Sequence, residues 1–403
     1  MTPGARVSAA ILILDNYLVG MPENKALLNW FRGNRFAGSK DRRAIREIIF
    51  KCLRFRRSSL WPFEKAGLHQ SGRYLVIGML KLSGEQLSDI FNNEKYSPEA
   101  LSKKESTVIE SFDKIVAEAP FSVKQNFPDF LEQTLIDSLD IALLENLKCL
   151  NERASLFLRV NCIKAARETV VNSLKKEGII VKSIVNSSYG LKVLEKSKDV
   201  DKSRCYLTGE VEIQDISSQA AIEFINPIKG SKILDFCAGG GGKTLAMASL
   251  TLADSEFYVH DVSMARMKNL IERSKRAGFG VRILSTDVLK NSNHKFDLVV
   301  ADVPCSGTGA WRRNPGSKWW LTPDKLDELL LKQRKILLTA SKYVKSNGAF
   351  AYMTCSVLNK ENRDQINWFL SLNNDFCLEK DTLIYPAQGG DGFYASLLRK
   401  VSN

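Results

Sequence analysis

Short apolar runs alternate with helical patterns along the C-terminal half of the chain. The apolar runs read KILDF at 232–236, EFYVHD at 256–261, VRILS at 281–285, FDLVVAD at 296–302 and GAFAYMTC at 348–355. Apolar residues at helical spacing follow Lys243 and recur over 264–277 and 323–344. Near-continuous apolar strands separated by helices are typical of a mostly parallel sheet covered on both faces. The pattern therefore predicts an α/β domain of Rossmann-like topology over residues 211–403.

The N-terminal part of the chain has a wholly helical pattern. Predicted helices cover 9–18, 25–31, 39–55, 74–82, 84–92 and 97–117. Ser97 is the predicted N-cap of the last of these, with Pro98 at the first helical position, where a missing N–H is tolerated. Pro120 and Pro128 then interrupt the pattern. We predict an all-α domain over residues 1–130.

The pattern changes again between these two domains. Residues 130–152 are predicted to be helical, and strand, helix, strand and strand then follow over 154–162, 165–177, 179–185 and 189–195. Residues 131–210 are thus predicted to hold a helical linker and a small α+β, RRM-like insert. A sheet of this order can lie on RNA, but the insert has no aromatic stacking signature and the signal is weak.

Charge indicates a polyanionic partner. The 403 residues carry a formal net charge of +13, which favours nucleic acid, although lysines scattered for solubility would give the same balance. Basic side chains, among them Arg42 and Arg43, surround the apolar stripe of the predicted helix at 39–55. We predict that these two residues contact RNA; the alternative is a solvated helix face.

Cysteine and histidine usage argues against metal and disulfide frameworks. The eight cysteines form no C-x-x-C pair and there are only three histidines, so neither a zinc site nor structural disulfides are expected. No apolar run reaches the ~18 residues of a membrane span. We therefore expect a cytoplasmic monomer with no metal and no membrane partner.

Four consecutive glycines, Gly239 to Gly242, separate the first apolar strand from a helix. Glycine permits a positive φ and a close ligand, and the N–H groups of the following helix face whatever occupies the loop. A Walker A loop would need glycine where Cys237 stands, and a G-x-G-x-x-G loop would need glycine at Thr244. A nucleoside site fits better, with Asp261 at the second strand positioned for ribose hydroxyls. The pattern therefore suggests S-adenosylmethionine.

Side chains that follow the predicted strands should meet at one edge of the sheet, where such sheets bind ligands. They are Asp235, Asp261, Asp287, Asp302 and Cys355. Asp302 opens the segment DVPCSGTG, a polar loop predicted to be flexible, which contains Cys305. Asp302 can also be read as a Walker B aspartate, and either cysteine alone as an ordinary packed residue.

Two thiols beside a methyl donor suggest a particular chemistry. C5 of a pyrimidine is too weak a nucleophile to attack a methyl group, but adding a thiolate to C6 generates an enamine that is nucleophilic at C5. The C5 proton must then leave and the thiolate must be expelled, which gives the second thiol a use. The base must also leave its stack to reach such a site, so single-stranded or loop RNA is the expected substrate.

These motifs resemble those of a known family. The segments CAGGGGKT, DVPCSGTGAWRRNPGSKW, TCSVLNKEN, GGDGFYASLLRK and QDISSQ, with the NusB-like N-terminal stretch FAGSKDRRAIREIIF, are similar to the RNA cytosine-C5 methyltransferases. The closest resemblance is to the bacterial Sun/Fmu or RsmB type, which methylates small-subunit (16S) rRNA. The family usually has proline where this chain has Gly240, which questions the rigidity of the loop.

The resemblance implies a role for each matching residue. Cys355 would attack C6, Cys305 would help to release the methylated product, and Asp302 would lie between donor and base. The residues expected to hold S-adenosylmethionine are Cys237, Ala238, Gly239, Gly240, Gly241, Gly242, Lys243, Asp261, Asp287 and Asp302. The same chemistry on tRNA, a non-catalytic RNA-binding assembly factor and a P-loop ATPase are the alternatives.

A basic and aromatic segment follows the loop that contains Cys305. Arg312, Arg313 and Lys318 are predicted to grip the phosphates that flank the target base. Trp311, Trp319 and Trp320 either stack on bases or pack under the loop.

Overall fold

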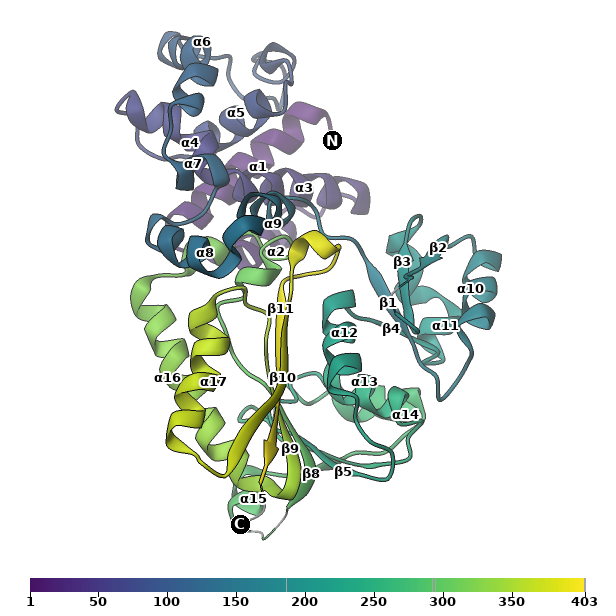
Figure 1. The fold of residues 1–403 in the computed structure, drawn as a ribbon. Helices are drawn as coiled ribbons and strands as arrows, with labels where there is room; N and C mark the ends of the chain where they lie inside the picture. Colours follow the sequence, from purple (N-terminus) through teal and green to yellow (C-terminus); the bar gives the residue numbers. More distant parts are fainter. Residues whose placement is uncertain (186, 292, 294, 402–403) are drawn as a thin grey trace. The chain divides into compact units, whose positions relative to one another are not determined.

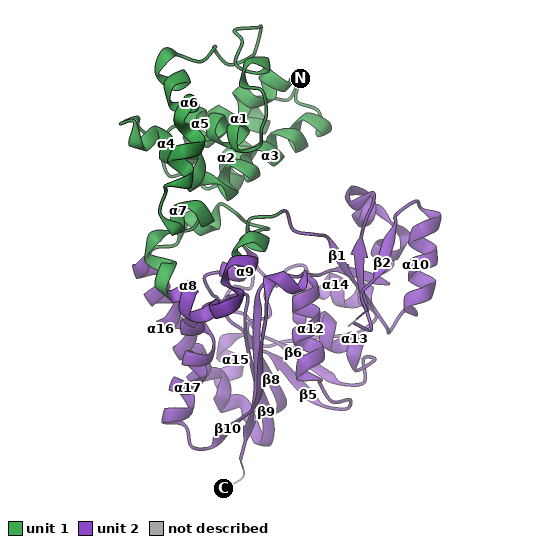
Figure 2. Cartoon of the chain, turned by 45° about the horizontal axis from the view of Figure 1, so that its top comes forward, with its two compact units in different colours: residues 1–133, 147–152, 311–322 green, residues 134–146, 153–310, 323–403 purple. Residues whose placement is uncertain are grey.

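The structure is a computed structural model that describes residues 1–185, 187–291, 293 and 295–401. The chain divides into two compact units (Figure 2). The first contains Met1–Gln133, Leu147–Glu152 and Trp311–Thr322, and the second contains Thr134–Asn146, Arg153–Ala310 and Pro323–Asn403. Among the described residues, no helix has the length and apolar character needed to cross a membrane.

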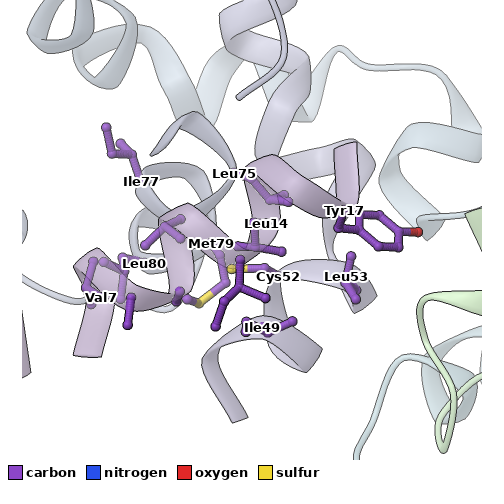
Figure 3. Packing of buried hydrophobic residues seen from close by; sticks show 14 of the residues in the cluster. Val7, Leu14, Tyr17, Ile49, Cys52, Leu53, Leu75, Ile77, Met79 and Leu80 are labelled. Carbon is purple, nitrogen blue, oxygen red and sulfur yellow. The ribbon is translucent and has the colours of Figure 1, made fainter. Parts of the chain in front are cut away.

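The first unit is helical. Its helices are α1 (Pro3–Leu18), α2 (Glu23–Gly33), α3 (Ser39–Arg54), α4 (Arg56–Lys65), α5 (Gly72–Leu82), α6 (Lys103–Ala117) and α7 (Phe121–Gln125). Buried side chains spaced at helical intervals on α1, α3 and α5, such as Leu14, Cys52 and Met79, meet in one apolar core (Figure 3). At Gly78 a Cβ would lie 2.1 Å from the carbonyl oxygen of Ser59, so glycine is required for α5 to approach α4.

Two helix predictions in this unit are wrong. The predicted helix at 84–92 is only a 3₁₀ turn at Leu87–Asp89, because Gly84, with φ of +70°, ends α5. The predicted N-cap at Ser97 is also wrong, since α6 begins after Ser102. Ser102 and Glu105 form a capping box there, in which the Glu105 N–H donates to Ser102 Oγ at 3.3 Å. Helix α4 was not predicted.

A short helical segment, whose residues are divided between the two units, comes before a small sheet of the second unit. The predicted helix at 130–152 is broken into α8 (Glu132–Leu139), a 3₁₀ turn and α9 (Leu143–Leu150), because Asp140 has φ of 44°. The small sheet contains β1 (Phe157–Val160), β2 (Val181–Ser183), β3 (Gly190–Val193) and β4 (Val211–Ile213), with α10 (Arg167–Lys176) and α11 (Arg204–Leu207). Its order is β2-β3-β1-β4 and every pairing is antiparallel. β4, just beyond the predicted insert, completes this sheet.

A seven-stranded sheet forms the main body of the second unit (Figure 1). Its strands are β5 (Lys232–Asp235), β6 (Glu256–Val259), β7 (Arg282–Ile283), β8 (Phe296–Asp302), β9 (Val344–Thr354), β10 (Phe376–Ile384) and β11 (Phe393–Lys400). They lie in the order β10-β11-β9-β8-β5-β6-β7. Strands β5 to β9 pair in parallel, and the C-terminal hairpin β10–β11 adds antiparallel strands.

Helices cover both faces of this sheet. They are α12 (Ile216–Ile225), α13 (Gly242–Leu250), α14 (Leu270–Ala277), α15 (Thr286–Asn291), α16 (Pro323–Ala340) and α17 (Arg363–Leu372). Alternate strand residues point to opposite faces, so Ile233 packs in the cluster with Met247 of α13. Its neighbour Leu234 packs with Leu337 of α16 and Phe369 of α17. The predicted fold class, a Rossmann-like α/β domain preceded by an all-α domain and a small α+β insert, is confirmed.

Several boundaries in this unit differ from the prediction. The helix predicted at 264–277 begins only at Leu270, after a series of turns, and the helix predicted at 323–344 ends at Ala340, so that β9 already begins at Val344. Helices α12, α15 and α17 and the hairpin β10–β11 were not predicted. Most of β10 is only partly buried, so its sequence lacks the apolar run on which the other strands were recognised.

Candidate active site

The carboxyl ends of three adjacent parallel strands bring the predicted site residues together. Asp235 ends β5, Asp302 ends β8, and Cys355 follows the last residue of β9. The strand register brings these ends side by side, because Asp302 lies opposite Met353 of β9 and Asp235 lies opposite Val300 of β8. Asp287 is placed differently, in the first turn of α15 with an exposed side chain.

Two thiols from different loops meet at this edge. Cys305 Sγ lies 3.3 Å from Cys355 Sγ, although the residues are 50 positions apart in the chain. Both cysteines are free. The hydrogen bond to Cys355, burial, and the negative charges of Cys355 and Glu361 raise the pKa of the Cys305 thiol well above its usual value. Cys305 therefore keeps its proton at neutral pH and can donate it to the sulfur of Cys355.

A partly buried ion pair lies beside the thiols. Lys243 Nζ of α13 is 2.7 Å from Asp302 Oδ2 and 4.9 Å from the centre of the Phe393 ring. Burial alone would lower the pKa of Lys243, but the charge of Asp302, the hydrogen bond to it and the nearby sulfur of Cys355 raise that pKa overall. The ammonium group is thus a fixed positive charge at this edge of the sheet.

The glycine loop connects β5 to α13 in a conformation that favours glycine. Gly239 and Gly241 have φ of 50° and 82°, in the left-handed region. The Gly239 N–H donates to Asp261 Oδ2 at 3.0 Å. Asp261 is buried, and its other oxygen accepts the Ser263 N–H at 2.9 Å. Arg266 Nη1 also reaches Asp261 Oδ2, at 3.2 Å.

Asp235 lies under this loop with an altered acidity. It is buried, and Thr244 Oγ1 donates to its Oδ2 at 2.6 Å. Burial raises the pKa of Asp235 to about 6, with the charge of Asp302 adding to the effect and the Thr244 hydrogen bond opposing it. Burial likewise raises the pKa of Cys237. Cys237 is therefore a neutral thiol in the loop at neutral pH.

The loop that follows β8 is held in place, which corrects the prediction that it is flexible. Ser306 donates from its backbone N–H to Glu361 Oε1 at 2.8 Å and from its hydroxyl to Glu361 Oε2. Thr308 Oγ1 lies 2.9 Å from Ser356 Oγ and accepts the Val357 N–H at 3.0 Å. The Cys305 loop and the segment after Cys355 are thus bound to one another on both sides of the thiols.

Glu361 is the centre of this network, and no expectation from the sequence assigned it a role. Its side chain is 0% exposed, and its Oε1 also accepts Gln333 Nε2 of α16 at 2.9 Å. Tyr352 of β9 donates its hydroxyl to the Glu361 carbonyl at 2.7 Å. The motif TCSVLNKEN contains Glu361, but burial of a carboxylate among partners from distant segments leaves no local signal in a single sequence.

The segment after the Cys305 loop belongs to the first unit and is largely buried there. Lys318 is 1% exposed, and its Nζ donates to Asn151 Oδ1 at 3.0 Å. Burial, aided by Arg54, lowers the pKa of Lys318 to about 7. Arg312 is 5% exposed. The side chains of Lys318 and Arg312, predicted to grip phosphates, are therefore not accessible in this structure, whereas Arg313 is partly exposed.

The tryptophans of this segment pack instead of presenting open stacking faces. Trp311 is 1% exposed. Trp319 donates its indole N–H to the carbonyl of Leu53 at 2.7 Å, and Trp320 packs edge-on against Tyr17 with ring centres 5.4 Å apart. Of the two alternatives, packing is the one observed. On α3, Arg43 is exposed and Arg42 is partly buried, with its Nε donating to the Ala37 carbonyl.

The main body of the second unit matches a known protein family. Residues 222–399 match the family described as 16S rRNA methyltransferase RsmB/F. They form an RsmB/F-type domain. The family predicted from the motifs is thus confirmed for this part of the chain. The match includes the glycine loop, both thiols and Glu361. No group of three or more His, Cys, Asp or Glu side chains suited to a metal ion occurs among the described residues.

Curated relatives are named as methyltransferases of small-subunit rRNA. The chain is 32% identical over 270 residues to ribosomal RNA small subunit methyltransferase B of Photorhabdus laumondii, which covers 62% of this chain and 61% of that protein. It is 33% identical over 264 residues to the protein of the same name from Citrobacter koseri, again covering 62% and 61%. The similarity therefore spans about three fifths of these relatives' length.

Solved structures share the fold. The crystal structure of PH0851 superposes with a TM-score of 0.75 at 23% identity and covers 99% of each chain. The structure of NSun6 from Pyrococcus horikoshii with SFG has a TM-score of 0.62 at 19% identity, covering 69% of this chain and all of that one. At these identities the likeness concerns the fold alone.

Proposed function

We propose that this protein is an S-adenosylmethionine-dependent RNA methyltransferase that forms 5-methylcytosine in small-subunit (16S) rRNA. The observation that carries the proposal is the pair of thiols 3.3 Å apart beside the Lys243–Asp302 ion pair. The RsmB/F family match of residues 222–399 supports the same reaction class. The proposal includes a cytoplasmic monomer whose partner is RNA.

The residues around the glycine loop fit a bound nucleoside. Gly239 and Gly241 adopt a positive φ, and Asp261 presents a buried carboxylate beside them, suited to ribose hydroxyls. Asp235 Oδ1 is buried with no hydrogen-bond partner among the described residues, which leaves one polar atom for a ligand. When bound, S-adenosylmethionine supplies a methyl group attached to a positively charged sulfur. Residues 237–243, Asp261 and Asp302 would hold it, while Asp287, exposed on α15, would contribute only at the rim.

Cys355 is proposed as the nucleophile. Its sulfur would form a bond to C6 of cytosine, and the electron pair of the C5–C6 double bond would become available at C5. C5 would then take the methyl group as the bond between that group and the donor's sulfur breaks, which leaves the donor as a neutral thioether. Lys243 supplies a fixed positive charge beside the thiols. Asp302 is placed at the end of β8, between the glycine loop and the thiols, where it can accept a hydrogen bond from the cytosine edge.

Cys305 is proposed to act in product release. After transfer, the C5–H bond breaks and gives up its proton, the double bond re-forms, and the bond between C6 and the Cys355 sulfur breaks. Because the pKa of Cys305 is raised, Cys305 keeps its proton and can give it to the departing sulfur of Cys355, 3.3 Å away. The Cys305 thiolate formed in this way is a strong base that can accept the C5 proton. We assign Cys305 to this proton transfer.

The alternatives predict different behaviour. The same chemistry on tRNA would keep the thiol pair and change only the RNA, while a non-catalytic assembly factor would have no use for the pair. A P-loop ATPase would use Lys243 for phosphates, but Lys243 is paired with Asp302. On the RNA side, Arg43, Arg42 and Arg313 stay candidates for phosphate contact.

A covalent trapping experiment tests the assignment. The Cys305→Ala variant, incubated with S-adenosylmethionine and unmodified small-subunit rRNA, should accumulate RNA bound to Cys355 and show a retarded band on a denaturing gel. The Cys305→Ala/Cys355→Ala double variant is the control and should show no band. If the parent protein transfers methyl groups but the Cys305→Ala variant gives no retarded band, the assignment of Cys305 to product release is wrong.

A further inference from the structure

Two carbonyl groups of the glycine loop are bound from outside by polar side chains. The Gly240 carbonyl accepts a hydrogen bond from Arg273 Nη1 of α14. The Gly242 carbonyl accepts from Arg159 Nη1 at 3.3 Å and from Gln214 Nε2 at 3.2 Å. A peptide group is planar and trans, so fixing the direction of a carbonyl also fixes the N–H of the next residue. These contacts therefore set the direction of two N–H groups, those of residues 241 and 243.

The two arginines that bind the loop, Arg159 and Arg273, lie beside one buried carboxylate, Glu212 of β4. Glu212 is 2% exposed; its Oε2 lies 2.9 Å from Arg273 Nη2, and its Oε1 lies 2.5 Å from Arg276 Nη2. Arg159 stands directly opposite Glu212 in the antiparallel pairing of β1 and β4. A single negative charge is thus surrounded by three guanidinium groups.

Charge keeps this cluster together. Burial lowers the pKa of Arg159 to about 10, with the charge of Glu212 opposing that change and the charge of Arg273 adding to it. Arg159 therefore remains protonated at neutral pH. Without Glu212, the positive charges of Arg159, Arg273 and Arg276 would repel one another, because the negative charge that lies among them in this partly buried site would be missing.

The loop has a specific need for such support at residue 240. Glycine places little restriction on its own backbone, and Gly240 stands between two residues with positive φ, Gly239 and Gly241. The Arg273 guanidinium lies against the loop, with Nη1 3.2 Å from the position a Cβ would take on Gly240. The Gly241 N–H donates to the Ala238 carbonyl at 2.8 Å, and the charge-assisted hydrogen bond from Arg273 to the Gly240 carbonyl holds the same peptide plane from its other end.

We propose that Glu212 is a positioning residue for the methyl donor, which acts by holding Arg273 on the Gly240 carbonyl. The small sheet thereby sets the affinity of the glycine loop for S-adenosylmethionine. This inference rests on the proposed donor site and adds to it a residue that touches neither donor nor RNA.

Calorimetric titration of the full chain with S-adenosylhomocysteine tests the inference. Glu212→Gln and Arg273→Met should each weaken binding by about tenfold, the loss expected from removing a charge-assisted hydrogen bond. The double variant should be no weaker than the weaker single variant, because both act through one contact. The matched control is Glu210→Gln, which breaks the ion pair of Glu210 with Arg204 at 2.9 Å and should bind as the parent does.

Kinetics separate positioning from a general loss of structure. In methyl transfer the KM for S-adenosylmethionine should rise in Glu212→Gln and Arg273→Met while the KM for RNA stays unchanged. Parental affinity in both variants, or additive losses in the double variant, would overturn the inference. Should Glu212→Gln fail to fold, Arg273→Met on the partly exposed face of α14 decides alone. A parent that binds no S-adenosylhomocysteine would instead overturn the donor site itself.

Discussion

Replacing Glu361 by glutamine removes one buried negative charge and almost no volume. Ser306 N–H and Gln333 Nε2 both donate to Glu361 Oε1, at 2.8 Å and 2.9 Å. The amide oxygen of glutamine can still accept both bonds. The Ser306 hydroxyl, which donates to Oε2, would have to turn and accept from the new NH₂ group. The network therefore keeps its connections and loses its charge.

The expected magnitude follows from that loss. Hydrogen bonds to charged groups contribute about 1 kcal/mol more than neutral ones, so weakening three of them costs about 2 kcal/mol in total after partial relaxation. If the loss falls on the placement of Cys305, the rate of methyl transfer should drop roughly thirtyfold. The charge of Glu361 also raises the pKa of Cys305. In Glu361→Gln that pKa should fall, and the pH–rate profile should move to lower pH.

The assay is single-turnover transfer of a tritiated methyl group to small-subunit rRNA, measured across pH, together with thermal unfolding. The control is Glu379→Gln, which removes an exposed carboxylate that binds Arg399 at 2.6 Å on the edge strand β10. It should leave both rate and pH profile unchanged. A Glu361→Gln variant with the parental rate and pH profile would refute the assignment of Glu361 to the placement of Cys305.

Three further predictions follow from individual contacts. Arg266→Ala should bind S-adenosylhomocysteine a fewfold tighter in calorimetry, because the exposed Arg266 competes for the Asp261 carboxylate and such pairs contribute at most about 1 kcal/mol; weaker binding would contradict this. The pKa of Asp235 is about 6 in the folded protein, whereas the ordinary pKa of an aspartate is 3.8. Its contribution to the free energy of unfolding is therefore fully present below about pH 4 and is lost as pH rises through about 6. In urea unfolding, the stability of the parent relative to Asp235→Asn should therefore be greater at about pH 4 than at about pH 7, and an equal difference at both would argue against the raised pKa. Ser102→Ala should lower the stability of the first unit by about 1 kcal/mol through loss of the capping box with Glu105. A melting temperature equal to that of the parent would contradict this prediction.

The parts of the fold that were predictable are those with a strong local pattern. The parallel strands β5, β6, β8 and β9 were recognised because strands buried on both faces are almost wholly apolar. Strand β10 was missed because it is only partly buried. The helix predicted at 84–92 failed because the left-handed backbone at Gly84 ends α5, a conformation that a glycine permits but does not require.

The site residues likewise fall into those that the sequence predicts and those that it does not. The thiols and carboxylates at the strand ends were recognisable because parallel strands bring their carboxyl ends to one edge. Glu361 was not recognised, since its partners Ser306 and Gln333 lie 55 and 28 residues away in the chain. Lys318 was assigned to phosphates because it lies just beyond the Cys305 loop in the sequence, yet it is 1% exposed. Its burial depends on segments that come together only in the folded first unit.

The most direct test of the proposed function is bisulfite sequencing of unmodified small-subunit rRNA after incubation with S-adenosylmethionine and either the parent protein or Cys355→Ala. One cytosine protected by the parent and unprotected with Cys355→Ala is the predicted result, and it would establish reaction, nucleophile and target together. Protection by both proteins would contradict the role of Cys355. The absence of any protected cytosine would contradict small-subunit rRNA as the substrate.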